Sequence, residues 1–205
     1  MSLYYSADEL DALERDKRTH LINSITGIKP ANMIGTVSAN AEENLAIFSS
    51  VVHLGSHPPL IGFVLRPQGN APRDTYNNIK QNPYFTINQV PVNAVERAHK
   101  TSTRFAPEVS EFERCGFTAQ YLNGFSAPFV AESPVKIGLR LINTIVIPDN
   151  NTELMIGQIE ALHLDDEQLE NEGQLNLEAL GIAGISGLNS YYSLKREKIM
   201  PSPAR

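Results

Sequence analysis

Short apolar runs separated by turn-forming residues dominate this chain, and they predict strands more often than helices. Four of these runs lie in the first half of the sequence, at residues 33–38, 45–49, 59–66 and 84–90. Residues 135–146 then alternate apolar and polar positions, which is the pattern of a strand with one buried face. A further apolar run at residues 153–164 follows a turn at Asp149, so the two runs together predict a long β-hairpin.

The N-terminus and the segments between strands carry helical patterns instead. Ser6 and Glu9 have the spacing of a capping box, and apolar residues recur behind them at helical intervals. We therefore predict one helix over residues 8–24, ended by Gly27. Shorter helices or helical turns are predicted at residues 73–82, 92–101 and 110–114.

The order of these elements decides the fold class. Strands follow one another with short helices between them, and the regular strand–helix–strand alternation of a parallel sheet is missing. The sequence therefore predicts a mainly β domain, an antiparallel barrel with short flanking helices. We expect an N-terminal helical segment at residues 1–27, the barrel domain at residues 28–200 and a tail at residues 201–205.

Composition and charge exclude several classes of partner. The 205 residues are 41% hydrophobic, enough for one buried core, and the formal net charge is −6. Lysine and arginine are scattered rather than clustered, which disfavours nucleic acid as the main partner. Because no run of about 18 apolar residues and no apolar leader occurs, we expect no membrane partner and a cytoplasmic location.

The segment Arg73-Asp74-Thr75 combines a cation, a carboxylate and a hydroxyl at a predicted helix start. Free backbone N–H groups and the helix dipole favour an anion there, and arginine can bind phosphate oxygens through two hydrogen bonds. Asp74 would cap the helix rather than bind the anion. The segment therefore predicts a phosphate site, while a capped surface turn explains the same residues.

Two further segments carry small polar side chains next to predicted elements. Phe48-Ser49-Ser50-Val51 ends a strand, where exposed backbone amides can bond the edge of a heterocycle or simply end the strand. Thr101-Ser102-Thr103-Arg104 offers three hydroxyls and a cation, which suit either an anion site or a solvated loop. Both interpretations stay open for each segment.

The histidines, the cysteine and the glycines do not form a metal or dinucleotide motif. His53 and His57 are four residues apart, but the glycine and prolines around them argue against a helix, and no third ligand is evident. Cys115 is the single cysteine, so neither an intrachain disulfide nor a cysteine metal cluster can form. Residues 181–187 are glycine-rich without the spacing of a dinucleotide-binding loop. We therefore expect no metal site.

Seven segments, taken in their order, carry a resemblance to a known family. They are TVSANAEENLAIFSS from residue 36, PPLIGF from 58, PRDTYNNI from 72, YFTINQV from 84, TSTRFAPEVSEFERCGF from 101, FVAESPVKIGLRL from 129 and GLNSYY from 187. Together they resemble the flavin reductase-like family with an FMN-binding split barrel, close to its flavoredoxin branch. The resemblance extends over residues 34–192.

This resemblance implies an antiparallel Greek-key split β-barrel, a homodimer, and FMN bound in a groove near the dimer interface. Residues 48–51 would hold the edge of the isoalloxazine ring, largely through backbone groups, and Arg73 and Thr75 would hold the phosphate. The full set of implied cofactor-binding residues is Thr36, Ser38, Phe48, Ser49, Ser50, Val51, Arg66, Arg73, Thr75, Thr101, Ser102 and Tyr192.

The chemistry of such a protein belongs to the flavin ring, so the family implies no catalytic side chain. We expect an enzyme, an FMN-binding NAD(P)H:flavin oxidoreductase in which hydride passes from a nicotinamide to N5 of the flavin. NAD(P)H would be a transient electron donor, and a redox partner protein is a further expected contact. Two alternatives stay open: a flavoredoxin-type electron carrier without pyridine-nucleotide activity, and a non-catalytic binding protein on the same barrel.

Overall fold

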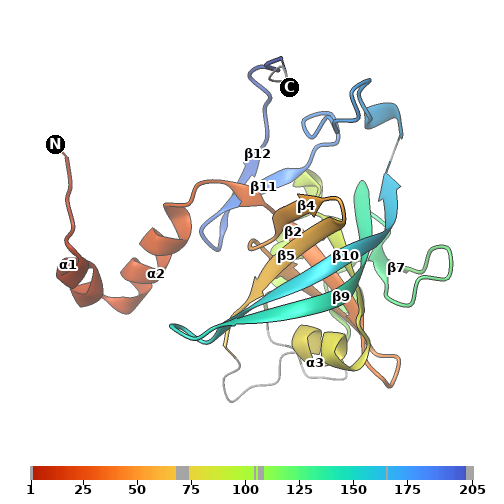
Figure 1. The fold of residues 1–205 in the computed structure, drawn as a ribbon, viewed down its shortest axis with the longest axis horizontal. Helices are drawn as coiled ribbons and strands as arrows, with labels where there is room; N and C mark the ends of the chain where they lie inside the picture. The colour runs from red at the N-terminus through yellow and green to blue at the C-terminus, as the bar shows by residue number, and fades with distance from the viewer. Residues whose placement is uncertain (1, 68–73, 104, 106–108, 165, 202–205) are drawn as a thin grey trace.

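A curved antiparallel sheet forms the body of the protein (Figure 1), whose computed structural model describes residues 2–67, 74–103, 105, 109–164 and 166–201. Its strands are β2 Asn32–Val37, β3 Glu43–Phe48, β4 Val52–Ser56, β5 Pro59–Leu65, β6 Tyr84–Gln89, β9 Val135–Ile147 and β10 Thr152–Leu164. They lie in the order β3-β2-β6-β9-β10-β5-β4, and every neighbouring pair is antiparallel. The predicted mainly β, antiparallel split barrel is confirmed.

The two edge strands of this sheet, β3 and β4, are consecutive in the sequence and are joined by residues 49–51, which we call the 49–51 connection. From Phe48 to Val52 the chain can reach at most about 14 Å, because an extended chain covers about 3.3–3.6 Å per residue. The sheet therefore has to curl until its edges approach each other, and this curl makes the barrel. Because the described residues of β3 and β4 are not paired in the sheet, the barrel is split along this seam.

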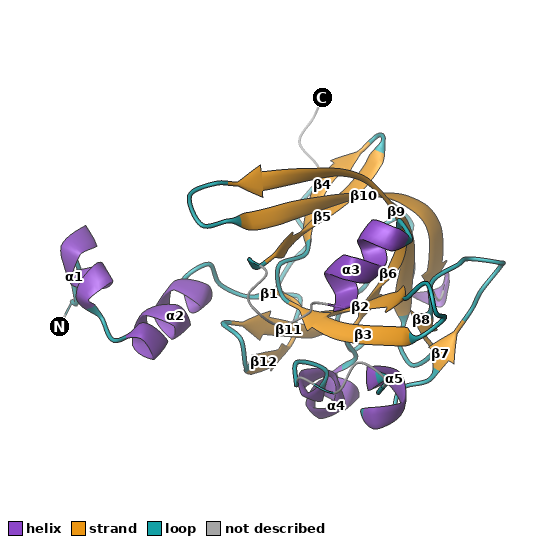
Figure 2. Ribbon diagram, turned by 90° about the horizontal axis from the view of Figure 1, so that it is seen from below, coloured by secondary structure: helices purple, strands orange, loops and turns teal. Residues whose placement is uncertain are grey.

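Helix α3, Asp74–Gln81, lies on the path from β5 to β6. These two strands are consecutive in the chain but three positions apart in the sheet, and α3, the helix between them, lies across the barrel, as Figure 2 shows. The helix packs on β2 and β3 and buries Thr75, Asn78 and Ile79 on one face. The helix predicted over residues 73–82 is confirmed for residues 74–81.

Buried side chains form clusters on both faces of β2. Ile34 points into the barrel, where Phe63 and Phe85 meet edge to face with ring centroids 5.5 Å apart. Met33, the neighbouring residue, points outward into a second cluster that includes Phe112. Because β2 is buried on both faces, its central residues Met33, Ile34 and Gly35 follow one another without an alternating polar position.

Short elements complete the fold around this sheet. The turn η1 Val92–Ala94 and the helices α4 Val95–Lys100 and α5 Glu111–Arg114 lie beside β3 (Figure 2). The remaining elements are β1 Lys29–Pro30, β11 Ala183–Ser186 and β12 Ser190–Ser193 in one small sheet, β7 Ala119–Gln120 paired with β8 Phe129–Val130, and the turn η2 Asp166–Gln168. None of the helices in the described ranges has both the length and the apolar character needed to cross a membrane.

The N-terminal arm, residues 2–28, projects away from the barrel in both views (Figure 1 and Figure 2). It holds two helices, α1 Ala7–Ala12 and α2 Arg15–Ser24, so the prediction of one continuous helix over residues 8–24 is wrong. The predicted capping box of Ser6 and Glu9 is present, but Leu13 adopts an extended conformation with ψ 144°. The Glu14 side chain then accepts two backbone N–H groups of the next turn, which starts the second helix.

Six short strands are absent from the sequence-based prediction: β1, β4, β7, β8, β11 and β12. The β4 sequence VHLGS has no clear alternation, and all of its residues except Gly55 are exposed at the sheet edge. The β11 sequence AGIS is short and has small side chains. Tertiary pairing rather than local pattern makes these segments strands.

Gly35 on β2 leaves no room for a side chain. A Cβ atom there would lie 2.3 Å from the Pro128 carbonyl oxygen and 2.6 Å from Oγ1 of Thr86, which donates a hydrogen bond to that same carbonyl. We predict that Gly35→Ala lowers the free energy of unfolding by about 1–3 kcal/mol through overpacking, measured by urea denaturation. Gly55→Ala, whose nearest neighbour would lie 3.4 Å away, is the control, and an equal loss in both variants would refute the steric explanation.

Candidate functional site

The 49–51 connection is the first part of the candidate site. Its middle residue, Ser50, donates from Oγ to the Val64 carbonyl on β5 at 3.0 Å and accepts from the Val64 N–H at 3.1 Å. The Val52–Gly62 pair belongs to the β4–β5 ladder. The Ser50 side chain extends this ladder by bonding Val64, two residues further along β5. Ser50 fixes the connection to the barrel, while the backbone of residues 49–51 belongs to none of the described strands.

A shallow apolar hollow of about 370 Å³ opens beside this connection. Val51, Leu60, Ile61 and Ile159 contribute to its wall, so it lies where β4, β5 and β10 meet the seam. Pro30, just after the N-terminal arm, borders it as well. Such a lining suits the flat, largely apolar face of an aromatic ring, with backbone groups alongside to bond its polar edge.

A buried polar network joins α3 to the barrel. Nδ2 of Asn44 on β3 donates to Oγ1 of Thr36 and to Oγ1 of Thr75, both at 3.1 Å, and Nδ2 of Asn78 also donates to Thr36 at 3.1 Å. All four residues are buried. Because Thr36 accepts from two amides and is completely buried, its position suits support of the network rather than direct contact with a ligand.

Thr75 differs from Thr36 because it lies in the first turn of α3. Its oxygen accepts from Asn44, so its hydroxyl proton can serve as a donor to a ligand at the helix start. The first backbone N–H groups of an α-helix have no partner within the helix, and they favour an anion at this end. Arg73, the cation predicted to share this site, lies outside the described residues.

Glu111 on α5 places a carboxylate near the same helix start. Its Oε2 accepts the N–H of Leu45 at 3.2 Å, which satisfies a backbone donor on the edge strand β3. Burial raises the pKa of the Glu111 carboxyl, the hydrogen bond from Leu45 lowers it, and the negative charge of Asp74 raises it further. A ligand anion close to these two carboxylates needs compensation by the helix N–H groups and a cation.

The hydroxyls of three other predicted site residues make local hydrogen bonds, and that of Ser38 also donates to Oε2 of Glu42 at 3.3 Å. Ser38 accepts from the N–H groups of the β2–β3 turn at 3.2 and 3.1 Å. Thr101 and Ser102 close the end of α4 by donating to the carbonyls three residues earlier, at 2.7 and 2.6 Å. The described contacts do not join any of the three to the network around Thr75.

Phe48, Arg66 and Tyr192 are the remaining predicted site residues, and the described contacts do not join them to one another. The Phe48 ring packs edge to face on Phe63, with centroids 5.3 Å apart, so only its backbone faces the connection in the predicted way. Arg66 is exposed just after β5, and Tyr192 on β12 is 44% exposed. The structure therefore brings together Thr36 with Thr75 and Ser49 with Ser50 and Val51, and leaves the others apart.

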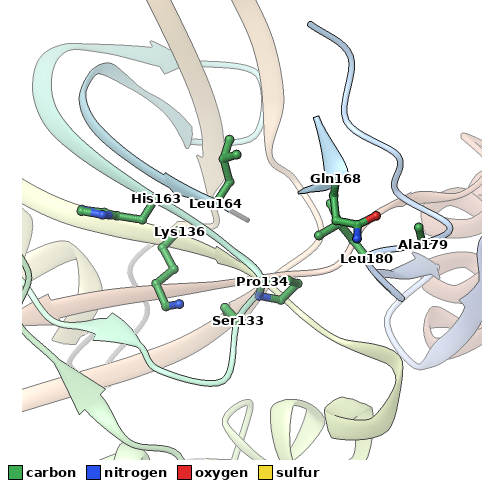
Figure 3. A pocket seen from close by; sticks show the side chains of 8 residues that line it. All are labelled: Ser133, Pro134, Lys136, His163, Leu164, Gln168, Ala179 and Leu180. Carbon is green, nitrogen blue, oxygen red and sulfur yellow. The ribbon is translucent and has the colours of Figure 1, made fainter. Parts of the chain in front are cut away.

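A second, larger cavity of about 500 Å³ lies at the start of β9, and Figure 3 shows its lining. Lys136 extends toward Ser133, whereas the His163 ring points away from Gln168 and Leu180 (Figure 3). Oγ of Ser133 is buried without a hydrogen-bond partner among the described residues. None of the predicted cofactor residues lines this cavity, so it is separate from the seam.

Comparison with known proteins decides the family. The family described as "Flavin reductase like domain" matches residues 28–180 of this chain, which is well over half of its length. The chain belongs to this family. The seam, the network and α3 all lie inside the matched residues, whereas almost the whole N-terminal arm lies outside them.

Solved structures of the same fold agree with this membership. A putative flavin reductase with a split barrel domain from Shewanella frigidimarina NCIMB 400 is 41% identical, covers 98% of this chain and 99% of its own, and has a TM-score of 0.93. The flavoredoxin of Desulfovibrio vulgaris (Miyazaki F) is 23% identical over 86% of this chain and 92% of its own, with a TM-score of 0.73. An FMN-binding protein from Thermus thermophilus is 16% identical over 98% of this chain and 100% of its own, with a TM-score of 0.73.

Asn44, Asn78 and Glu111 are site residues that the sequence analysis missed. Asn44 is the polar residue at the start of the otherwise apolar run NLAIF, a signal that could have marked it. Asn78 follows Thr75 by three residues and precedes the buried Ile79, so both polar residues share the inward face of the helix. Glu111 contacts β3 across 66 residues of sequence, and no local pattern reveals such a contact.

We predict that Asn44→Ala lowers the free energy of unfolding by about 1–3 kcal/mol, because it leaves the buried Thr75 hydroxyl without its described donor and removes one of the two amides that donate to Thr36. Chemical denaturation followed by circular dichroism measures the loss. Asn40→Ala is the matched control, since the Asn40 side chain lies in the exposed β2–β3 turn and its described hydrogen bond uses the backbone N–H. A loss at Asn44 no larger than at Asn40 would refute the network.

We predict that Glu111→Gln makes stability less dependent on pH. Since burial raises the pKa of the folded carboxyl above its ordinary value of 4.5, the folded state holds this proton more tightly, and stability falls as pH rises from about 4.5 through the folded pKa. The variant should therefore lose less stability than the wild type between pH 5 and pH 8, as measured by urea midpoints. Glu113→Gln, at an exposed position on the same helix, should keep the wild-type slope.

Proposed function

We propose that this protein is an FMN-binding oxidoreductase that takes electrons from NAD(P)H, with the flavin held at the seam between β3 and β4. The observation that carries the proposal is the 49–51 connection. It offers unpaired backbone beside an apolar hollow, within a chain that belongs to the flavin reductase-like family. The start of α3, with the Thr75 hydroxyl, supplies the polar end of the same site.

The residues present fit such a cofactor in their chemistry. Backbone groups of residues 49–51 would bond the edge of the isoalloxazine ring, and Val51 and Ile61 would pack on its apolar face. Thr75 and the α3 N–H groups would bind the phosphate, together with Arg73. Asn44 would hold Thr75 in place through its hydrogen bond.

Bound there, the flavin would supply the redox chemistry by accepting hydride from a nicotinamide and passing electrons to a free flavin or a partner protein. The chain itself has to bind the cofactor, orient it and keep water from the reacting face. The apolar hollow serves the last task. No side chain near the seam is required as a nucleophile or a general base, so we assign no catalytic residue.

A second candidate function is electron transfer without any pyridine-nucleotide activity. The fold that this chain shares with a flavoredoxin favours it. A third is binding without flavin on the same barrel. Spectroscopy separates the three.

We also propose that the protein acts as a homodimer. An outer apolar face, formed by Val52, Leu54, Val64, Leu154 and Ile145, lies on β4, β5, β10 and β9. Val64, Leu154 and Ile145 are direct partners in the ladder and point away from Phe63 inside the barrel. Val52, Leu54 and Ile145 are 47%, 41% and 47% exposed. A contiguous apolar patch of this kind marks an interface.

We predict that Arg73→Ala weakens FMN binding by about 1–3 kcal/mol, as for the loss of a charged hydrogen bond. Fluorescence quenching of added FMN measures the dissociation constant. Lys80→Ala removes a cation from the other end of the same helix and should leave the affinity unchanged. Equal affinity of the wild type and Arg73→Ala would refute the phosphate assignment.

We predict that the purified protein, loaded with FMN and desalted, is yellow, and that NADH or NADPH bleaches this band in stopped-flow mixing. Bleaching at a rate of seconds or faster supports the oxidoreductase. A yellow protein that neither nucleotide bleaches, yet that dithionite reduces, supports the electron carrier. Colourless protein after desalting supports binding without flavin and contradicts the proposal.

A further inference from the structure

The cavity at the start of β9 contains two buried polar atoms that lack a partner. Oγ of Ser133 and Nε2 of His163 have no hydrogen-bond partner among the described residues, and both residues line this cavity. Buried polar groups in folded proteins are nearly always hydrogen-bonded, because an unbonded group loses its contact with water and gains nothing in return. Two such atoms at one cavity indicate that a bound molecule supplies the missing partner.

Lys136 adds a cation to the same cavity. It lies directly opposite His163 in the β9–β10 ladder, so the two side chains leave the same face of the sheet, and Figure 3 shows Lys136 extending toward Ser133. The ion pairs among the described residues do not include Lys136, although its side chain is half-buried. Burial lowers the pKa of its ammonium group, and the negative charge of Glu132 opposes this shift. An anion in the cavity would stabilise the ammonium group in the same way.

Glu132 is occupied elsewhere. Its carboxylate accepts the backbone N–H of Thr118 at 3.1 and 3.2 Å and the Thr118 hydroxyl at 3.2 Å. Lys136 is therefore left to pair with a ligand. The charge of Glu132 still limits what that ligand can be, because it repels a dianion such as phosphate more strongly than it repels a monoanion.

The size and the remaining lining of the cavity favour an organic molecule over water. Its volume of about 500 Å³ lies within the range of small-molecule sites, roughly 300–1,000 Å³. Pro134, Leu164 and Leu180 give it apolar walls. Water can bond the Ser133 hydroxyl, but it brings no negative charge to Lys136 and gains nothing from the apolar walls. A molecule with one carboxylate and an apolar body matches all of these groups.

The far wall of the cavity is fixed in place. It comes from the loop after β10, which contributes Gln168 and Leu180. Arg196 holds this loop from outside, because its backbone N–H donates to Oε2 of Glu178 at 3.0 Å and its guanidinium pairs with Oε1 of Glu170 at 2.5 Å. The cavity is thus bounded by β9 and β10 on one side and by an anchored loop on the other.

We propose that this cavity binds a small organic carboxylate. The Lys136 ammonium pairs with its negative charge, and the Ser133 hydroxyl donates a hydrogen bond to it. His163 can donate a second hydrogen bond from Nε2, and the apolar body lies against Leu164 and Leu180. This site shares no lining residue with the hollow at the seam, so the inference goes beyond the proposed flavin function and does not depend on it.

Isothermal titration calorimetry of the full-length protein without flavin tests the class of ligand, with benzoate as the probe. Benzoate should bind saturably at millimolar concentration or below. Benzyl alcohol, which has the ring without the charge, should bind at least tenfold more weakly, and inorganic phosphate at the same concentration should not displace benzoate. No saturable binding of either benzoate or hexanoate would overturn the proposal. Equal affinity for benzyl alcohol, or displacement by phosphate, would overturn it as well.

Substitution of Lys136 tests where the carboxylate binds. Lys136→Gln should weaken benzoate binding at least tenfold, because it removes the positive charge and keeps a side chain of similar length. Lys195→Gln is the matched control, since Lys195 is an exposed lysine that lies outside the cavity, and it should keep the wild-type affinity. Equal affinity of the wild type and Lys136→Gln would contradict the proposed site.

Substitution of Ser133 separates binding from a structural role. Ser133→Ala should weaken benzoate binding severalfold. Without benzoate it should not lower the free energy of unfolding, because the Ser133 hydroxyl has no partner to lose among the described residues. Ser190→Ala, at an exposed position outside the cavity, should change neither quantity. A loss of stability in ligand-free Ser133→Ala would show that the hydroxyl already has a structural partner, and would overturn the proposal.

Added FMN distinguishes this cavity from the seam. Because the two sites share no lining residue, saturating FMN should leave the affinity for benzoate within about twofold of its value without FMN. Displacement of benzoate by FMN would place benzoate at the seam and overturn the proposal. A protein that binds benzoate through Lys136 but binds no FMN would contradict the proposed function alone.

Discussion

The shortness of the 49–51 connection is the constraint on which the rest of the structure depends. Two strands at opposite edges of a seven-stranded sheet are tied together by three residues, so the sheet cannot stay open. The described residues of its edge strands β3 and β4 stay unpaired, so the barrel is split there. Ser50 fixes the connection beside the split by bonding β5 with its side chain instead of its backbone. The backbone groups of residues 49–51 therefore stay outside the described strands, and the seam between β3 and β4 is the candidate site.

The other half of the site follows from the order of the strands. Because β5 and β6 lie apart in the sheet, α3, the helix between them, lies across the barrel (Figure 2). The helix is short and mostly polar, so apolar packing through Ile79 is supplemented by the amides of Asn44 and Asn78. These hydrogen bonds fix the start of α3 relative to β2 and β3. A ligand that spans the seam and the helix start thus meets two parts held by one network.

Much of this could be predicted from the sequence, and the gaps have physical causes. The long hairpin, β2, β5 and α3 carry clear periodicity or turn signals, so their predicted positions agree with the structure to within about two residues. The break at Leu13 and Glu14 could not be predicted, since a glutamate that caps the helix after it looks like any helical glutamate. Edge strand β4 forms only because β5 is there to pair with it.

The candidate site was predicted in part, for a similar reason. Serine and threonine residues can be picked out from a sequence, but the sequence does not show which group each hydroxyl bonds. Thr36 and Thr75 are both predicted cofactor-binding residues, yet Thr36 is completely buried whereas Thr75 lies at the start of α3. Ser38, Thr101 and Ser102 bond their own turns, a use that local sequence does not separate from ligand binding. Domain boundaries and ligand contacts remain predictions.

Hydrogen bonds rather than a large apolar contact fix α3 to the barrel, and this affects how long the folded protein survives in the cell. Asn44 and Asn78 hold the helix on the barrel, so a nucleotide gripped at that helix start would be bound by the native state and not by the unfolded chain. Any ligand with this preference shifts the unfolding equilibrium in proportion to the logarithm of its concentration. Cells rich in the cofactor would then keep the barrel from proteases for longer than cells depleted of it.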